Sequence, residues 1–295
     1  IRRKNEEILW SGHKRNQGIY RPQDAGRLTG LNNISQGLGL ELVGYGKAEA
    51  LKVQNESEGG YNNSQSLDGG LDVNYNITPG LKASLTVNTD FAETEVDDRQ
   101  INLTRFPIRF PEKRDFFLEG ANIFRFAPSS GVYQYFSRKI GLRSGNPIPI
   151  LYGGRVIGKI GKVEVAAQQV KTRETDNFSS EDFSVIRLKQ NFLKESSIGV
   201  LYTRRHTNKG KEFVPPLQDR NTLGVDLTLN TSTFLKHQNL QFQAFAVIHN
   251  PELPGEINNN IWDRSARGLR FNFPNDPWSG SLSYREFGIN YDPAV

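Results

Sequence analysis

Strict alternation of apolar and polar residues constrains this chain more than any other feature. Between residues 81 and 91, every odd-numbered residue except Thr89 is apolar and every even-numbered residue is polar. The same pattern runs through 71–77 and 223–229, and weaker versions cover 240–248 and 269–273. Successive side chains of a strand point to opposite faces, so the pattern predicts β-strands with one apolar and one polar face. The 81–91 stretch also has the roughly 9–11 residues that a tilted strand needs to cross a bilayer.

The pattern extends to eleven predicted strands and indicates an all-β chain. We place them at 40–52, 68–77, 81–91, 149–159, 162–172, 183–193, 197–207, 221–231, 238–249, 265–273 and 279–290. Alternation alone fits a soluble β-sandwich as well as a membrane barrel.

The predicted connections distinguish these two folds. Short ones fall at 78–80, 160–161, 194–196, 232–237 and 274–278, and longer polar ones fall at 53–67, 173–182, 208–220 and 250–264. Outer-membrane barrels have short turns at one end and long loops at the other, whereas a sandwich has no reason to sort its loops in this way. We therefore expect a transmembrane antiparallel β-barrel in a bacterial outer membrane.

Composition narrows the class further. The 295 residues include no Cys and no Met, and they hold no apolar run long enough for a transmembrane helix. The net charge of +5 comes from basic residues scattered among 32 acidic ones, without a nucleic-acid-binding motif. We expect outer-membrane lipid as a partner, no nucleic acid and no cofactor.

The predicted strands divide the chain into regions. Residues 1–39 lack alternation and are expected to form a linker or an inward-folded segment, and 40–295 are expected to form the barrel. Residues 92–148 must leave and re-enter the sheet at the same end, so we expect a lumenal or external excursion acting as a plug or lid, with a local strand at 133–139. Eleven is an odd strand number, whereas bacterial single-chain barrels have an even one. The chain also begins with Ile1, so we expect a mature or partial segment and an incomplete barrel of about 11 strands.

The excursion contains a dense mixture of charges and aromatic rings. Such charges are too costly to face lipid, so we expect them to pair within a wet lumen. The candidates for lumen or plug ion pairs are Arg105, Arg109, Glu112, Lys113, Arg114 and Glu119. The candidates for sugar stacking are Phe116, Phe117, Tyr133 and Tyr135, although we favour packing as their role.

Several motifs in this region resemble a known family. They are Asn88-Thr-Asp-Phe91, Glu95-Val-Asp97, Asn102-Leu-Thr-Arg-Phe106, Phe110-Pro-Glu-Lys-Arg114, Phe116-Phe-Leu-Glu-Gly120 and Phe136-Ser-Arg-Lys-Ile-Gly141. They are similar to an uncharacterised family of Gram-negative envelope proteins, whose members resemble a family-nine carbohydrate-binding module followed by a large outer-membrane barrel. The resemblance implies a location and an architecture, with the module itself outside this chain.

Metal and catalytic sites have weaker support. Asp90, Glu93, Glu95 and Asp97 offer oxygen atoms for Ca²⁺, but their spacing does not match an EF-hand loop. We favour a solvated strand extension or salt bridges for these four, and expect no metal. Glu112 and Glu119 could serve as a hydrolytic carboxylate pair, but each has basic neighbours, so we expect no enzyme.

Three functions follow from these features. The first is a barrel that passes or receives a solute linked to carbohydrate, with 92–148 controlling access. The second is a membrane anchor or assembly component with envelope-protein partners and no transport. The third, a carbohydrate-active hydrolase, rests on family analogy alone.

Overall fold

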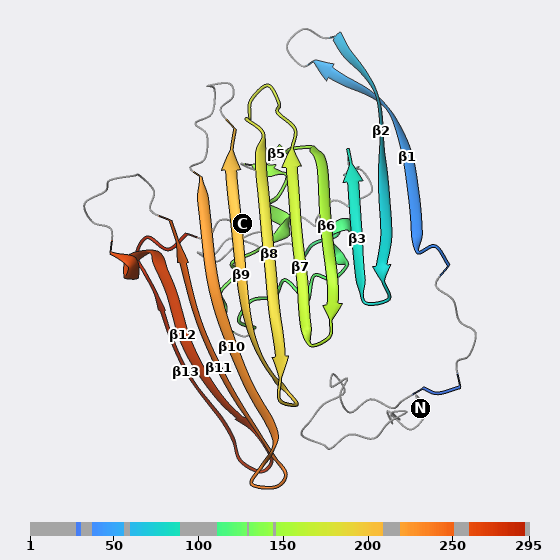
Figure 1. Ribbon diagram of the computed structural model, residues 1–295. Coiled ribbons are helices and arrows are strands. Elements are labelled where there is room, and N and C mark those ends of the chain that lie inside the picture. The colour runs from blue at the N-terminus through green and yellow to red at the C-terminus, as the bar shows by residue number, and fades with distance from the viewer. Residues whose placement is uncertain are drawn as a thin grey trace, which may run out of the picture.

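The computed structural model describes residues 28–30, 37–55, 60–88, 111–128, 130–143, 146–208, 219–250 and 260–292. Its main element is an eleven-stranded antiparallel sheet in which each strand pairs with its neighbour in sequence order (Figure 1). The sheet is open, since its order runs from β1 to β13 without a pair between these two strands. The all-β class and the eleven strands are thus confirmed.

The strands of this sheet are β1 (Leu40–Asn55), β2 (Gly60–Thr78), β3 (Leu81–Val87), β6 (Ile150–Ile160), β7 (Val163–Thr172), β8 (Glu181–Phe192), β9 (Ser196–Thr207), β10 (Arg220–Phe234), β11 (Gln238–His249), β12 (Ser265–Pro274) and β13 (Ser279–Phe287). A separate two-stranded sheet joins β4 (Leu142–Arg143) and β5 (Asn146–Pro147). The helical elements are α1 (Asp115–Leu118) and the 3₁₀ helices η3 (Ser137–Lys139) and η4 (Ile261–Arg264).

Two local predictions are wrong. The predicted loop at 53–67 is largely strand, because β1 and β2 continue to pair up to Asn55 and Gly60. Its Ser, Asn and Gly content favours a loop locally, but cross-strand pairing overrides this preference. The predicted local strand at 133–139 is also absent, and η3 occupies its end instead.

With the exception of 56–59, which is as short as 275–278, the connections sort by length between the two ends of the sheet. At the turn end, the strands are joined through 79–80, 161–162, 193–195, 235–237 and 275–278. At the loop end, the links are 56–59, 88–149, 173–180, 208–219 and 250–264. The longest link leaves β3 and returns to β6, and these two strands pair directly, with Val87 opposite Tyr152.

Residues 111–128 and 130–143 lie within this longest link and are called the packed segment here. They lie against one face of the sheet, behind the central strands in Figure 1. We call this side the covered face and the opposite side the open face. Phe124, Phe126 and Val132 of the packed segment form a buried cluster with covered-face residues such as Leu201 and Val247. Among the described residues, the apolar core therefore lies between the packed segment and the sheet.

Candidate functional site

Glu119 holds the packed segment to two strands of the sheet. Its carboxylate receives Lys82 Nζ of β3 at 2.8 Å and Arg155 Nη2 of β6 at 3.0 Å. Arg155 Nη1 also donates to the carbonyl oxygens of Phe116 and Glu119, and the guanidinium lies 4.9 Å from the Phe116 ring centre. Next along the chain, Gly120 has a φ of +67°, and a Cβ there would lie 2.6 Å from Cδ1 of Ile157. The segment thus needs glycine to turn this close to β6.

A second ion pair lies inside the packed segment. Glu112 accepts hydrogen bonds from Arg114 Nε at 2.8 Å, Arg114 Nη2 at 2.7 Å and Ser137 Oγ at 2.6 Å. Arg114 is 5% exposed, donates to the carbonyl of Ile140 at 2.8 Å and lies 4.1 Å from the Phe117 ring centre. Burial opposes ionisation of Glu112, but the bonds and charge of Arg114 outweigh it and keep the pKa of Glu112 below its ordinary value. The ionised carboxylate of Glu112 and the guanidinium of Arg114 therefore hold the packed segment in its folded conformation.

A third pair spans the covered face of three strands. The Arg187 side chain of β8 crosses Gly199 of β9 and meets Asp226 of β10, with Nη1–Oδ1 at 2.5 Å and Nη2–Oδ2 at 3.0 Å. Asp226 Oδ2 also accepts from the backbone N–H of Ala127 at 3.3 Å. A Cβ at residue 199 would lie 2.6 Å from Arg187 Nη1, so the guanidinium uses the space that glycine leaves.

The aromatic candidates are mostly engaged within the protein. Phe117 is 3% exposed, and Phe116 packs against Arg155. Tyr135 packs on Phe124, and its hydroxyl accepts from Gln168 Nε2 at 3.0 Å. Burial raises the pKa of Tyr135 well above its ordinary value, so it stays protonated. Of the four sugar-stacking candidates, Tyr133 has an exposed side chain.

The remaining predicted site residues are placed as follows. Lys113 is half-buried in the packed segment beside Glu112, whose carboxylate accepts its backbone N–H. Arg105, Arg109, Asp90, Glu93, Glu95 and Asp97 lie outside the described residues. Within the described ranges, no group of three or more His, Asp or Glu residues is placed to hold a metal ion.

A polar hollow lies on the covered face at the turn end, beyond the packed segment. Its volume is about 770 Å³. Its lining residues are Asn122, Arg125, Pro128, Lys159, Glu164, Arg187, Lys189, Asn191, Lys194, Glu195, Ser196, Ser197, Asp226, Thr228, Asn230 and Gln241. The sequence patterns identified neither this hollow nor its residues, because the lining comes from six strands, one turn and the packed segment. The sequence signal that could have indicated this lining is the set of polar residues that alternate with apolar ones along each strand.

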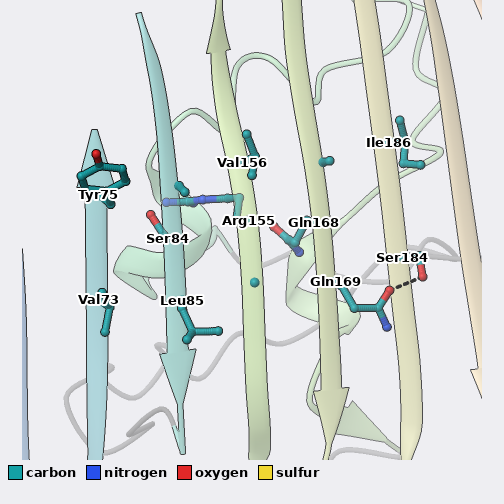
Figure 2. A pocket seen from close by; sticks show the side chains of 13 residues that line it. Val73, Tyr75, Ser84, Leu85, Arg155, Val156, Gln168, Gln169, Ser184 and Ile186 are labelled. Carbon is teal, nitrogen blue, oxygen red and sulfur yellow. Dashed lines mark hydrogen bonds between the residues drawn. The ribbon is translucent and has the colours of Figure 1, made fainter. Parts of the chain in front are cut away.

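The open face has the opposite character. Leu71, Leu223 and Leu269 are 44%, 47% and 50% exposed, and they belong to a row of apolar side chains that crosses the sheet. Figure 2 shows part of this face, with Val73 and Tyr75 on β2, Leu85 on β3, Val156 on β6 and Ile186 on β8. The polar Gln169 and Ser184 on this face form a hydrogen bond with each other.

Charged residues on the open face gather at the loop end. Lys171 pairs with Asp182 at 3.5 Å, and Arg267 pairs with Glu286 at 2.6 Å. Lys52, Arg204 and His206 are the other basic side chains on this face of the described strands, and they too lie near the loop end. Towards the turn end, the described open-face positions carry no charge. The open face is thus an apolar band with a charged border on one side.

No helix of the described ranges has both the length and the apolar character needed to span a bilayer.

Comparison with known protein families finds a match to part of the chain. A family model described as a domain of unknown function, DUF5916, matches residues 39–150. This range covers β1, β2, β3 and the packed segment, and it is consistent with an uncharacterised family. No curated protein and no solved structure matches the chain.

Proposed function

We propose that this chain forms part of a bacterial outer-membrane β-barrel, which places its open face in lipid and its packed segment in the lumen. The supporting observation is the contrast between the two faces at the turn end. There, open-face residues such as Leu227 and Leu229 are apolar, whereas Asp226, Thr228 and Asn230 between them line the polar hollow. A wall between lipid and water requires this arrangement.

The dimensions of the apolar band agree with this proposal. On β6 it runs from Tyr152 to Ile160, which is about 26 Å along the strand at ~3.3 Å per residue. With a strand tilt of ~40°, its height becomes about 20 Å, near the roughly 25 Å of outer-membrane barrels. A soluble sandwich would instead cover its apolar face with a second sheet.

The open edges of the sheet add a structural requirement. Within the described part of the chain, β1 and β13 each have a partner on one side only. Unpaired backbone groups cannot be exposed to hydrocarbon, where each costs several kcal/mol. In the proposed barrel, further antiparallel strands therefore pair with these two edges and close the sheet.

The proposed role is solute passage or reception, with the packed segment controlling access. A second candidate role is a membrane anchor or assembly component without transport, which the firm attachment of the segment through Glu119 and the Arg187–Asp226 pair favours. A hydrolase has less support, since Glu112 and Glu119 are both held in ion pairs. The link to carbohydrate rests on the family resemblance and on the exposed Tyr133.

Single-cysteine labelling tests the membrane orientation without background, because the chain has no Cys. Cysteines replace Val225, Leu227, Thr228 and Asn230 one at a time in protein reconstituted into lipid vesicles. We expect a water-soluble maleimide to react at residues 228 and 230 and not at 225 and 227. A bimane label at 225 or 227 should be quenched by spin-labelled lipid. Equal aqueous reactivity at all four positions would refute the barrel.

A pair of glycine variants tests the role of the packed segment. A Cβ at Gly224 would lie 2.8 Å from the Phe126 ring, so Gly224→Leu should displace the segment. Gly154→Ala on the open face meets nothing within 4 Å and serves as the control. We expect higher single-channel conductance for Gly224→Leu than for the control and the wild type. Unchanged conductance, with displacement verified by increased proteolysis of the segment, would favour the anchor.

A further inference from the structure

The carboxylates around the polar hollow are already occupied. Glu164 receives Lys189 Nζ at 3.1 Å and Asn191 Nδ2 at 2.7 Å. Asp226 is held by Arg187, as described above. The third carboxylate, Glu195, accepts from Ser232 Oγ at 2.6 Å. The lining thus holds five cationic side chains, Arg125, Lys159, Arg187, Lys189 and Lys194, against these three carboxylates.

Three of these cations form no hydrogen bond or close ion pair with any described residue, namely Arg125, Lys159 and Lys194. Lys159 lies opposite Glu164 in the β6–β7 register and interacts with it electrostatically at longer range. The three cations come from three separate places, namely the packed segment, β6 and the turn between β8 and β9. In addition, Nε of Arg187, a side chain that is 1% exposed, has no hydrogen-bond partner in the described structure. The hollow therefore combines surplus positive charge with a buried, unused donor.

The neutral part of the lining supplies hydrogen-bonding groups. Ser197, Thr228, Asn230 and Gln241 belong to β9, β10 and β11. The buried Oδ1 of Asn230 has no hydrogen-bond partner within the described ranges. The volume of about 770 Å³ lies within the range of ~300–1,000 Å³ typical of small-molecule sites.

We propose that this hollow binds a small anionic solute bearing phosphate or carboxylate groups, held by Arg125, Lys159 and Lys194 and oriented by the neutral polar side chains. The inference rests on the proposed function, because in the barrel the hollow opens at the turn end and receives solute from that side. Anionic oxygens accept the strong charge-assisted hydrogen bonds that these three cations offer.

Binding by the full protein in detergent tests the inference. The probes are inorganic pyrophosphate and citrate, which separate phosphate from carboxylate chemistry, with trehalose as a neutral solute of similar size. Isothermal titration calorimetry compares the wild type with the triple variant R125Q/K159Q/K194Q. The control is K162Q/K236Q, which removes two turn-end lysines that do not line the hollow.

We expect at least one anion to bind the wild type, and the triple variant to weaken its binding by about tenfold or more. The control should lie within about twofold of the wild type, because neither lysine lines the hollow and salt screens the charge that it removes. Absence of binding by both anions, preferential binding of trehalose, or an equal loss in the control would overturn the inference. Circular dichroism confirms that each variant is folded.

The two proposals fail separately. If cysteine labelling shows alternation but neither anion binds, the barrel stands and the anion site falls. If labelling refutes the barrel, anion binding that the triple variant loses would still show an anion site in the hollow. The idea that the solute enters from one side of a membrane would then be refuted.

Discussion

Removing Asp226 should destabilise the packed segment more than any loss of an exposed ion pair. In the Asp226→Ala variant, Arg187 stays at a position where its side chain is 1% exposed, but it has no carboxylate to neutralise it. The backbone N–H of Ala127 also loses its acceptor. Both consequences fall on the contact between the sheet and the packed segment.

The expected magnitude follows from the burial of the pair. Breaking a buried ion pair by removing one partner costs about 3–5 kcal/mol, because the remaining charge is uncompensated. The hollow borders Arg187 and admits water, which favours the lower end, and the lost bond to Ala127 adds about 0.5–1 kcal/mol. We therefore expect the free energy of unfolding to fall by about 3–4 kcal/mol.

The assay is guanidinium unfolding of the reconstituted protein, followed by tryptophan fluorescence. Replacing both partners, as Arg187→Met with Asp226→Leu, removes the isolated charge and should recover most of the loss. Gly199→Ala should have a smaller effect than Asp226→Ala, since the guanidinium end can shift away from the new methyl group. A loss below about 1 kcal/mol for Asp226→Ala, or a double variant no better than the single one, would refute this reasoning.

Three further predictions concern the packed segment. Gly120→Ala should lower the free energy of unfolding by about 1–2 kcal/mol, measured by the same unfolding, because its φ of +67° disfavours a side chain and the methyl group meets Ile157. Phe126→Ala should cost about 3–5 kcal/mol in that assay, because this buried ring fills the core between segment and sheet. The depressed pKa of Glu112 means that its pair with Arg114 stabilises the segment above the ordinary glutamate pKa and loses this effect as pH falls through the depressed value. Proteolysis of the segment by pepsin, divided at each acid pH by the cleavage rate of an unfolded reference peptide, should therefore increase as pH falls in the wild type, and Glu112→Gln should flatten that pH dependence.

The strands were predictable because their signal is local. In 223–229, each apolar residue lies on the open face and each polar or glycine residue lies on the covered face. The alternation therefore predicted both the strand and the face on which each side chain lies. The extension of β1 and β2 was not predicted, because Gly60–Gly70 is rich in Ser, Asn and Gly, which favour a loop. Pairing with β1, which the local sequence does not reveal, makes this stretch a strand.

The candidate site depended on contacts that no local pattern contains. Glu119 is 37 residues from Lys82 and 36 from Arg155, and the packed segment between 111 and 143 has no periodicity to indicate its partners. The Arg187–Asp226 pair depends on a glycine in the strand between them, a relation that appears only when three strands lie in register.

The covered face differs between the middle of the strands and the turn end, and this difference limits how far a solute could enter the proposed barrel. Towards the middle of the strands, Ile157, Val185, Leu201 and Val247 are covered by the packed segment, while the turn end is polar and hollow. Displacing the segment would expose these apolar side chains to a wet lumen, which is unfavourable unless another surface covers them. In the proposed barrel, a solute entering from the turn end would therefore reach the Arg187–Asp226 pair and stop at the packed segment. Passage beyond this point requires a ligand or partner that binds the protein more tightly when the packed segment is displaced than when it is in place. Without such a ligand, the proposed barrel is suited to receiving a solute and not to its free diffusion.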